Sequence, residues 1–158
     1  MIGPELVQQV LELLSGEFRH VIIDTAAGFD EATLAAVALS TDLICLTSTD
    51  VPSVRNTRKS LEALNHIGFT QQHRHFIVNR ADAKVGLTLG DIEETIGLKI
   101  DVAVPSSRAV PLAVNQGEPI MLSDPRHPAA VAFTDLVVRF EPEHIPEPNG
   151  KRKRRRAK

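Results

Sequence analysis

Short, continuously apolar runs alternate along this chain with stretches in which apolar residues recur every three or four positions. The runs are rich in β-branched residues, which predicts buried strands. The spaced stretches predict amphipathic helices. We expect strands at residues 18–24, Leu43–Thr47, Arg74–Asn79 and 100–104, and helices at about 6–14, 30–40, 52–67, 88–96, 107–116 and 124–140.

Several residues at the ends of these stretches favour particular helix boundaries. Asp30 is expected to begin the second helix, and Thr88 with Asp91 resembles a capping box. Ser123 or Asp124 is expected to cap the last helix. Gly16, Gly68 and Gly117 are expected to end three of the others.

The order of these elements indicates a fold class. Strands and helices alternate, and the strands are apolar on both faces, as in a parallel sheet that helices cover on both sides. We therefore expect an α/β fold with a largely parallel sheet and helices on both faces.

Composition narrows the class of protein further. With 158 residues, 42 % of them hydrophobic, the chain can form one domain with a core. Its single cysteine, Cys45, excludes an internal disulfide and fits a reducing compartment. No apolar stretch reaches membrane-spanning length and no signal-peptide pattern is present. We therefore expect a cytoplasmic protein, with peripheral association at the inner membrane face as a further option.

The charge is divided unevenly along the chain. The last eight residues hold seven of the 18 basic residues, so the first 150 carry 11 basic against all 20 acidic residues. A Pro/Glu-rich stretch separates the two regions. We expect an α/β domain at residues 1–140, an extended linker at 141–150 and a disordered polybasic tail at 151–158.

The run Val-Ile-Ile-Asp-Thr-Ala-Ala-Gly, which ends at Gly28, carries the strongest hint of chemistry. It predicts a buried strand that places the Asp24 carboxylate at its carboxyl end, where ligands bind in open parallel sheets. The carboxylate suits a metal–phosphate group, and Gly28 lets a backbone N–H approach a phosphate closely. An ordinary turn explains the same run equally well.

Polar residues also follow the other predicted strands, which favours a ligand-binding edge. Asn79 offers a carbonyl acceptor and an amide donor that match the edge of adenine, although asparagine is also common in turns. The six histidines lack the spacing of a zinc site, and no Gly-x-Ser-x-Gly nucleophile motif is present.

Taken in order, four motifs resemble the MinD/ParA group of deviant-Walker P-loop ATPases, with the closer likeness to MinD-like and pilus-assembly (CpaE/TadZ-type) members. They are the strand and loop ending at Gly28, the segment Asp50-Val-Pro-Ser-Val-Arg55, the strand end Val78-Asn79-Arg80, and Val104-Pro105 followed by Asn115-Gln-Gly-Glu-Pro119. The likeness spans residues 18–140. It implies ATP and Mg²⁺ as cofactors of the complete protein.

The resemblance also implies roles for single residues. Asp24 would hold Mg²⁺ through water or position the attacking water, and Gly28 would offer its N–H toward the γ-phosphate. Asn79, with Arg80 beside it, would read adenine, and Pro105 would lie against the base. Arg55 would lie near an ATP-dependent homodimer face.

The 158 residues contain no Gly-rich phosphate loop with Gly-Lys-Ser/Thr. In the family that loop lies upstream, on a central strand, so we expect this chain to be the C-terminal part of a larger ATPase and inactive alone. The missing strand would leave a sheet edge unpaired, a route to self-association.

These features leave three functions open. One is part of an ATP-dependent dimerising switch, with a protein partner, in pilus, division-site or chromosome positioning. A second is a degenerate, non-catalytic module that contacts protein, membrane or DNA. A third is an unrelated flavodoxin-like domain.

The polybasic tail suits contact with anionic lipid or, nonspecifically, with DNA. It has no apolar face, so it does not resemble an amphipathic anchor. A solubilising tail is the simple alternative. Its candidate contact residues are Lys151, Arg152, Lys153, Arg154, Arg155 and Arg156.

Overall fold

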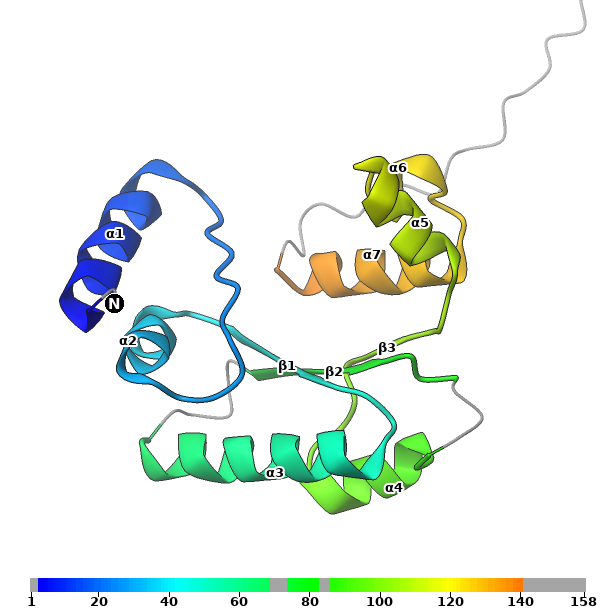
Figure 1. Ribbon diagram of the computed structural model, residues 1–158, viewed down its shortest axis with the longest axis horizontal. Coiled ribbons are helices and arrows are strands. Elements are labelled where there is room, and N and C mark those ends of the chain that lie inside the picture. The colour runs from blue at the N-terminus through cyan, green and yellow to red at the C-terminus, as the bar shows by residue number, and fades with distance from the viewer. Residues whose placement is uncertain (1–2, 69–73, 83–85, 141–158) are drawn as a thin grey trace, which may run out of the picture. The chain divides into compact units, whose positions relative to one another are not determined.

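The computed structural model describes residues 3–68, 74–82 and 86–140. They fall into two compact units, which divide between Ser106 and Ser107 and are described separately. Figure 1 shows the elements of both. The linker and tail expected from the sequence lie outside the described residues.

The N-terminal unit is built on a parallel sheet of three strands in the order β1-β2-β3. β1 (Leu43–Thr47) and β2 (Arg74–Asn79) have the predicted bounds, with Leu43 opposite Arg74. β3 (Val102–Val104) begins later than predicted. The reason is that the Asp101 carboxylate, in place of a backbone carbonyl, accepts the N–H of Phe76 at 2.7 Å.

Two helices, α3 (Val51–His66) and α4 (Leu89–Ile96), lie on the same side of the sheet in Figure 1. Their apolar residues pack onto β2 in a core of four fully buried side chains. Burial of this kind removes apolar surface from water, which is the main stabilising contribution in folding. The four are Val54, Phe76, Val78 and Ile92.

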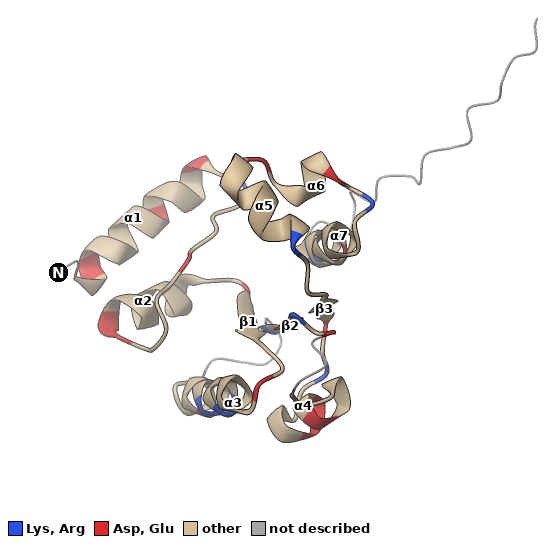
Figure 2. Ribbon diagram, turned by 45° about the vertical axis from the view of Figure 1, so that its right-hand side comes forward, with Lys and Arg blue, Asp and Glu red and all other residues tan. Residues whose placement is uncertain are grey.

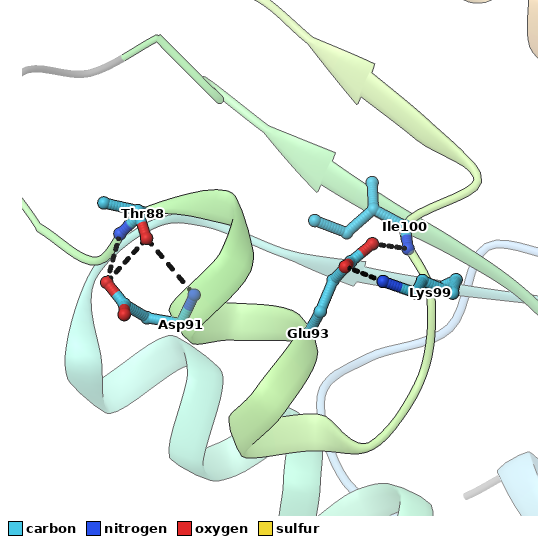
Figure 3. Close-up of polar contacts among 5 residues, drawn as sticks. All are labelled: Thr88, Asp91, Glu93, Lys99 and Ile100. Atoms are coloured by element: carbon cyan, nitrogen blue, oxygen red, sulfur yellow. Dashed lines mark hydrogen bonds and ion pairs between the residues drawn. The ribbon is translucent and has the colours of Figure 1, made fainter.

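The ends of α4 are fixed by side chains (Figure 3). Thr88 Oγ1 accepts the N–H of Asp91 at 3.2 Å, and the Asp91 carboxylate accepts the N–H of Thr88 at 2.9 Å, which confirms the predicted capping box. Farther along, Glu93 accepts a hydrogen bond from Lys99 at 2.6 Å and one from the N–H of Ile100 at 3.0 Å. These two bonds, the first of them larger, lower the pKa of Glu93.

The first two helices, α1 (Pro4–Glu17) and α2 (Glu31–Leu39), pack against each other. The Asp30 carboxylate accepts the N–H of Thr33 at 2.8 Å and begins α2 as predicted. The expectation that Gly16 ends the first helix was wrong, because α1 continues through it to Glu17. A glycine inside a helix weakens it by only about 1 kcal/mol, which packing can offset.

The predicted strand at residues 18–24 does not form. This segment has no regular secondary structure, and Ile22 is 91 % exposed. The physical reason is pairing, since a strand needs a neighbour to accept its backbone hydrogen bonds. Among the described residues the sheet holds only β1, β2 and β3, and none of them pairs with this segment.

The C-terminal unit consists of α5 (Ala109–Gln116), α6 (Ile120–Ser123) and α7 (Pro128–Phe140). Gly117 ends α5 in the left-handed region, with φ 71°, as predicted. The prediction that Ser123 or Asp124 caps the last helix was wrong, because α7 begins after His127. Proline is favoured at the first position of a helix, and Pro128 supplies it there.

Charge is segregated among the helices of the N-terminal unit. Figure 2 shows acidic positions on α1 and α4 and basic positions on α3. Within the described residues, no helix combines the length and the apolar character that crossing a membrane requires.

Candidate nucleotide groove

A groove of about 510 Å³ lies in the N-terminal unit, and we call it the β1 groove. Its size falls in the range of small-molecule and cofactor sites. Its walls come from the loop at residues 25–29, from α2, from β1 and its following residues, and from one side of α3. Asn79, at the end of β2, completes the lining.

Gly28 contributes to the loop wall of this groove. Its φ is 114°, a conformation that glycine adopts readily and other residues do not. No atom lies within 4 Å of the position that a Cβ would take. The structure therefore leaves space for a ligand beside the backbone at Gly28, and the contact with a phosphate stays a prediction.

Asn79, the last residue of β2, also contributes to the lining. Its carboxamide oxygen accepts the N–H of Arg80 at 3.0 Å. A carboxamide oxygen has a second lone pair, so the group still offers both an acceptor and a donor to a ligand. Arg80 itself has a φ of 54°, which is uncommon for a residue with a Cβ and marks a sharp change of chain direction.

The turn from β1 into α3 contains a hydrogen-bonded network of short polar side chains. The Asp50 carboxylate accepts the N–H of Ser53 at 2.9 Å and also accepts a hydrogen bond from the Ser48 hydroxyl. The hydroxyl oxygens of Ser48 and Ser53 are 2.9 Å apart. The hydrogen bond from Ser48, followed by those from Ser53, lowers the pKa of Asp50 to about 2. Asp50 is thus a fixed anion at the start of α3.

The structure brings together only part of the predicted site. Gly28 and Asn79 both line the β1 groove, while Asp24, Arg55, Arg80 and Pro105 are not among its lining residues. Asp24 is exposed and immediately precedes the lining loop, and Arg55 is exposed on α3. No cluster of three or more metal-ligating side chains occurs in the described part of the chain.

A polar stripe on α3 belongs to the groove and was missed from the sequence. Ser53, Asn56, Thr57 and Ser60 all line it. They are spaced by three or four residues, so they share one helix face. That spacing is the signal that could have identified them. A stripe of small polar residues beside an apolar stripe indicates a helix that packs with one face and lines a site with the other.

Near Pro105, a separate contact fixes the chain after β3. The Asp82 carboxylate accepts a hydrogen bond from the N–H of Ser106, and this bond lowers the pKa of Asp82. The N–H of Ala81 donates to the carbonyl of Val104 at 2.9 Å. The carboxyl ends of β2 and β3 are therefore joined by both backbone and side-chain bonds.

In the C-terminal unit, Ser107 and His127 form a pair that looks like a nucleophile and its base. Their Oγ and Nε2 atoms are 3.1 Å apart, while Nδ1 of His127 accepts the N–H of Ala129 at 3.1 Å. A neutral imidazole that accepts at Nδ1 carries its proton on Nε2. His127 therefore donates to Ser107 and cannot take its proton, so the pair acts as a clamp at the start of α7 and not as a catalytic dyad.

No family model matches the chain, but curated proteins do. The septum site-determining protein MinD of Thermotoga maritima is 28 % identical over 94 % of this chain and 56 % of its own length. MinD of Bacillus subtilis is 30 % identical over 92 % of this chain and 55 % of its own length. The chain thus spans about half the length of the curated relatives it matches.

Solved structures match as well. The MinC:MinD cell division protein complex of Aquifex aeolicus aligns with a TM-score of 0.77 and 25 % identity, over 92 % of this chain and 62 % of that one. A ParA family ATPase of Chlorobium tepidum, at 20 % identity, has a TM-score of 0.79 over 87 % of this chain and 57 % of that one.

Pyrococcus horikoshii MinD complexed with Mg-ADP, at 19 % identity, has a TM-score of 0.74 over 87 % of this chain and 56 % of that one. The similarities to the Chlorobium and Pyrococcus proteins, both below 25 % identity, concern the fold alone. They confirm an α/β fold with a parallel sheet flanked by helices. Over most of its length, the chain is homologous to the MinD/ParA family of ATPases.

Proposed function

We propose that this chain is part of a MinD/ParA-like ATPase that works as an ATP-dependent dimerising switch in positioning or assembly. The observation that carries the proposal is the β1 groove. It gathers the loop of Gly28, the polar end of β1 and Asn79 in one cavity of nucleotide size. The homology supplies the reason to read that cavity as a nucleotide site.

The proposed roles are those that the family resemblance implies, and the positions of Gly28 and Asn79 in the groove lining support two of them. Gly28 would offer backbone N–H to the γ-phosphate, and its open backbone suits close approach. Asn79 would contact adenine, with Arg80 beside it, and Pro105 would lie against the base. Arg55 is exposed on α3 and would lie at the ATP-dependent homodimer face.

Asp24 would hold Mg²⁺ through water. Its carboxylate is exposed and directly precedes the groove loop. Bound Mg-ATP supplies a phosphoryl group for transfer to water, and catalysis of that class depends on positioning and charge stabilisation. The contribution of this chain is therefore to orient the nucleotide and place one carboxylate near its phosphates.

The pathway is a narrower proposal. The relatives named here act in septum-site determination, which favours division-site positioning for this chain. A role in pilus assembly, as for CpaE/TadZ-type proteins, or in chromosome positioning rests on the sequence resemblance alone. In each case the partner would be a protein of the positioned machine, as MinC is in the Aquifex complex.

Nucleotide binding by the 158-residue chain tests the proposal directly. We expect a fluorescent ATP analogue with Mg²⁺ to bind weakly, because the sequence offers no Gly-Lys-Ser/Thr cradle. Asn79→Ala is expected to weaken binding about tenfold, as a lost hydrogen bond in a site does. The matched control Asn65→Ala alters an exposed asparagine outside the groove and should bind like wild type. Equal loss in both variants, or no binding by the wild type, contradicts the proposal.

Hydrolysis provides a separate readout. We expect the 158 residues to release no phosphate from ATP above the blank, since the main phosphate cradle is not in this sequence. Turnover that disappears in Asp24→Ala would show that expectation to be wrong, while it would strengthen the role proposed for Asp24.

A second candidate function is a non-catalytic binding module derived from such an ATPase. The observation that favours it is that Asp24, Arg80 and Pro105 do not line the β1 groove. This candidate predicts that nucleotide has no effect on any binding property of the chain. The absence of ATP-analogue binding in the titration above would select it.

For the polybasic tail we propose contact with a polyanionic surface. Six consecutive basic residues contribute roughly 1 kcal/mol each near an anionic membrane. Deletion of residues 151–158 is expected to abolish binding to vesicles that contain anionic lipid, or to duplex DNA, whichever the full chain binds. Equal binding with and without the tail contradicts this proposal.

A further inference from the structure

The chain turns sharply where β2 ends, and the turn contains a strained residue. Arg80 has a φ of 54°, a conformation that residues with a Cβ rarely adopt. Among the described residues, Arg80 is the single residue other than glycine with a positive φ. Backbone strain of this kind persists only where surrounding contacts hold it, and it is frequent at functional sites. The contacts that hold Arg80 therefore indicate what the turn does.

Two hydrogen bonds hold the turn directly before and after Arg80. Asn79 Oδ1 accepts the N–H of Arg80 at 3.0 Å, so the strained backbone keeps the Asn79 carboxamide in one orientation. The N–H of Ala81 donates to the carbonyl of Val104, the last residue of β3, at 2.9 Å. Because Asn79 lines the β1 groove, the conformation of Arg80 decides how the carboxamide is presented to a ligand there.

A third bond, which we call the Asp82 bridge, joins the turn to the segment after β3. The Asp82 carboxylate accepts the N–H of Ser106, and this bond lowers the pKa of Asp82, so the group is an anion at neutral pH. Hydrogen bonds to a charged acceptor are stronger than those between neutral groups. Ser106 lies two residues after Val104, so the bonds from the turn to β3 enclose Pro105. The bridge therefore fixes the segment that carries Pro105 to the turn that carries Asn79.

We propose that Asp82 is a positioning residue for recognition of the base: it holds Arg80 in its left-handed conformation and thereby sets the orientation of Asn79 beside Pro105. This inference rests on the proposed function, in which Asn79 and Pro105 contact adenine. Without the bond to Ser106, Arg80 can relax to a negative φ, and the N–H that orients the Asn79 carboxamide then changes direction. Asp82 does not line the β1 groove, so it acts through the backbone and not by contact with the ligand.

Binding of a fluorescent ATP analogue with Mg²⁺ to the full 158-residue chain tests the proposal. Asp82→Ala should weaken binding about fivefold, less than the loss of about tenfold expected for Asn79→Ala, because the carboxamide is present but no longer fixed. Asp82 is exposed, so this variant should fold normally, and far-ultraviolet circular dichroism checks that. The matched control Asp135→Ala removes the same charge from an exposed position on α7 and should bind like wild type.

A second substitution separates positioning from a general loss of structure. Glycine adopts a φ of 54° without strain, so Arg80→Gly should keep the turn in place even when the Asp82 bridge is absent. We expect the double variant Asp82→Ala/Arg80→Gly to recover binding to within about twofold of the wild type. Arg80→Gly alone should bind like wild type. A role of Asp82 through its charge alone predicts no such rescue.

The side-chain amide of Asn79 gives a readout that needs no nucleotide. Its N–H signals in a ¹⁵N–¹H NMR spectrum are identified by their disappearance in Asn79→Ala. We expect these signals to shift in Asp82→Ala, to return toward their wild-type positions in the double variant, and to stay unchanged in Asp135→Ala. This measurement distinguishes failure of the present proposal from failure of the proposed function, because it reports on the turn whether or not ATP binds.

Three results would overturn the proposal. One is wild-type binding, or an unchanged Asn79 amide, in Asp82→Ala. Another is a loss that Arg80→Gly does not restore, because Asp82 would then not act through the backbone of Arg80. The third is a loss of binding in Arg80→Gly alone, which would assign the contribution to the Arg80 side chain. If the wild type binds no nucleotide, the proposed function fails, and the amide signals alone decide whether the Asp82 bridge orients Asn79.

Discussion

Two apolar segments of the N-terminal unit have similar sequences, but one forms a buried strand and the other does not. His-Phe-Ile-Val in β2 is buried between neighbouring strands, with Phe76 and Val78 almost fully hidden. Val-Ile-Ile at residues 21–23 has the same strand-forming character, yet it is irregular and largely exposed. The comparison shows that an apolar run specifies a strand only where the rest of the described structure supplies a partner for its backbone.

The largest expected effect contrasts two phenylalanines from these regions. Phe76→Ala should lower the free energy of unfolding by about 3–5 kcal/mol, because Phe76 is 1 % exposed and its loss leaves a cavity. Phe18→Ala should change it by less than about 0.5 kcal/mol, since Phe18 is 61 % exposed. Urea unfolding measures both, and similar losses would mean that residue 18 is buried in solution.

A pair of glycine substitutions should differ in sign. Gly86 has a φ of 121°, and an added Cβ would collide with the backbone carbonyl of Thr49, so Gly86→Ala should destabilise by roughly 2 kcal/mol. Gly16 lies in α1 with nothing near it, so Gly16→Ala should stabilise by about 1 kcal/mol. Thermal unfolding of the two variants checks the contrast, which fails if both midpoints move the same way.

The capping box of α4 should give a smaller effect. Thr88→Ala removes the acceptor for the N–H of Asp91 and should cost about 1 kcal/mol of unfolding free energy. Thr41→Ala, at an exposed threonine outside any helix or strand, serves as the control and should be near neutral. Equal effects in a urea titration would show that the cap contributes nothing beyond threonine itself.

The smallest expected effect depends on pH. Hydrogen bonds from Ser48 and Ser53 lower the pKa of Asp50 from 3.8 to about 2 in the folded chain. A depressed folded pKa gives stability that is present above pH 3.8 and lost as the pH falls toward 2. Asp50→Asn keeps a capping side chain without the titration, so the slope of its unfolding midpoint between pH 5 and 2.5 should be shallower than that of the wild type. Parallel slopes would contradict this.

The sequence predicts β1, β2 and the ends of the neighbouring helices well, because there the local residue pattern agrees with the packing of the whole unit. The bounds of β1 and β2, the capping box at Thr88 and the end of α5 at Gly117 were all predicted correctly. Each depends on residues close in sequence or on continuous burial. The strand at residues 18–24 was predicted wrongly. A strand forms only where a partner strand pairs with it, and the hydrophobic pattern of the segment does not reveal whether a partner is present.

The site could be predicted only in part. Gly28 and Asn79 were identified from their places after apolar runs, and both line the groove. The polar face of α3 was not predicted, because the apolar stripe of Val54, Leu61 and Leu64 is enough to explain a helix that packs on a sheet. The positions of Asp24 and Pro105 outside the groove lining depend on loop paths, which short-range patterns do not determine.

The two chain segments that bring Asn79 and Gly28 to the β1 groove differ in their backbone hydrogen bonds. Next to Asn79 in the chain, the N–H of Ala81 donates to the carbonyl of Val104 at 2.9 Å. On the side of Gly28, the backbone of residues 21–29 makes no hydrogen bond among the described residues. A ligand that binds against Gly28 would fix the backbone of the lining loop, residues 25–29, and would bear the entropic cost of ordering it. A loop rigidified there, for example by proline at a compatible position, would tighten binding mainly by slowing ligand release.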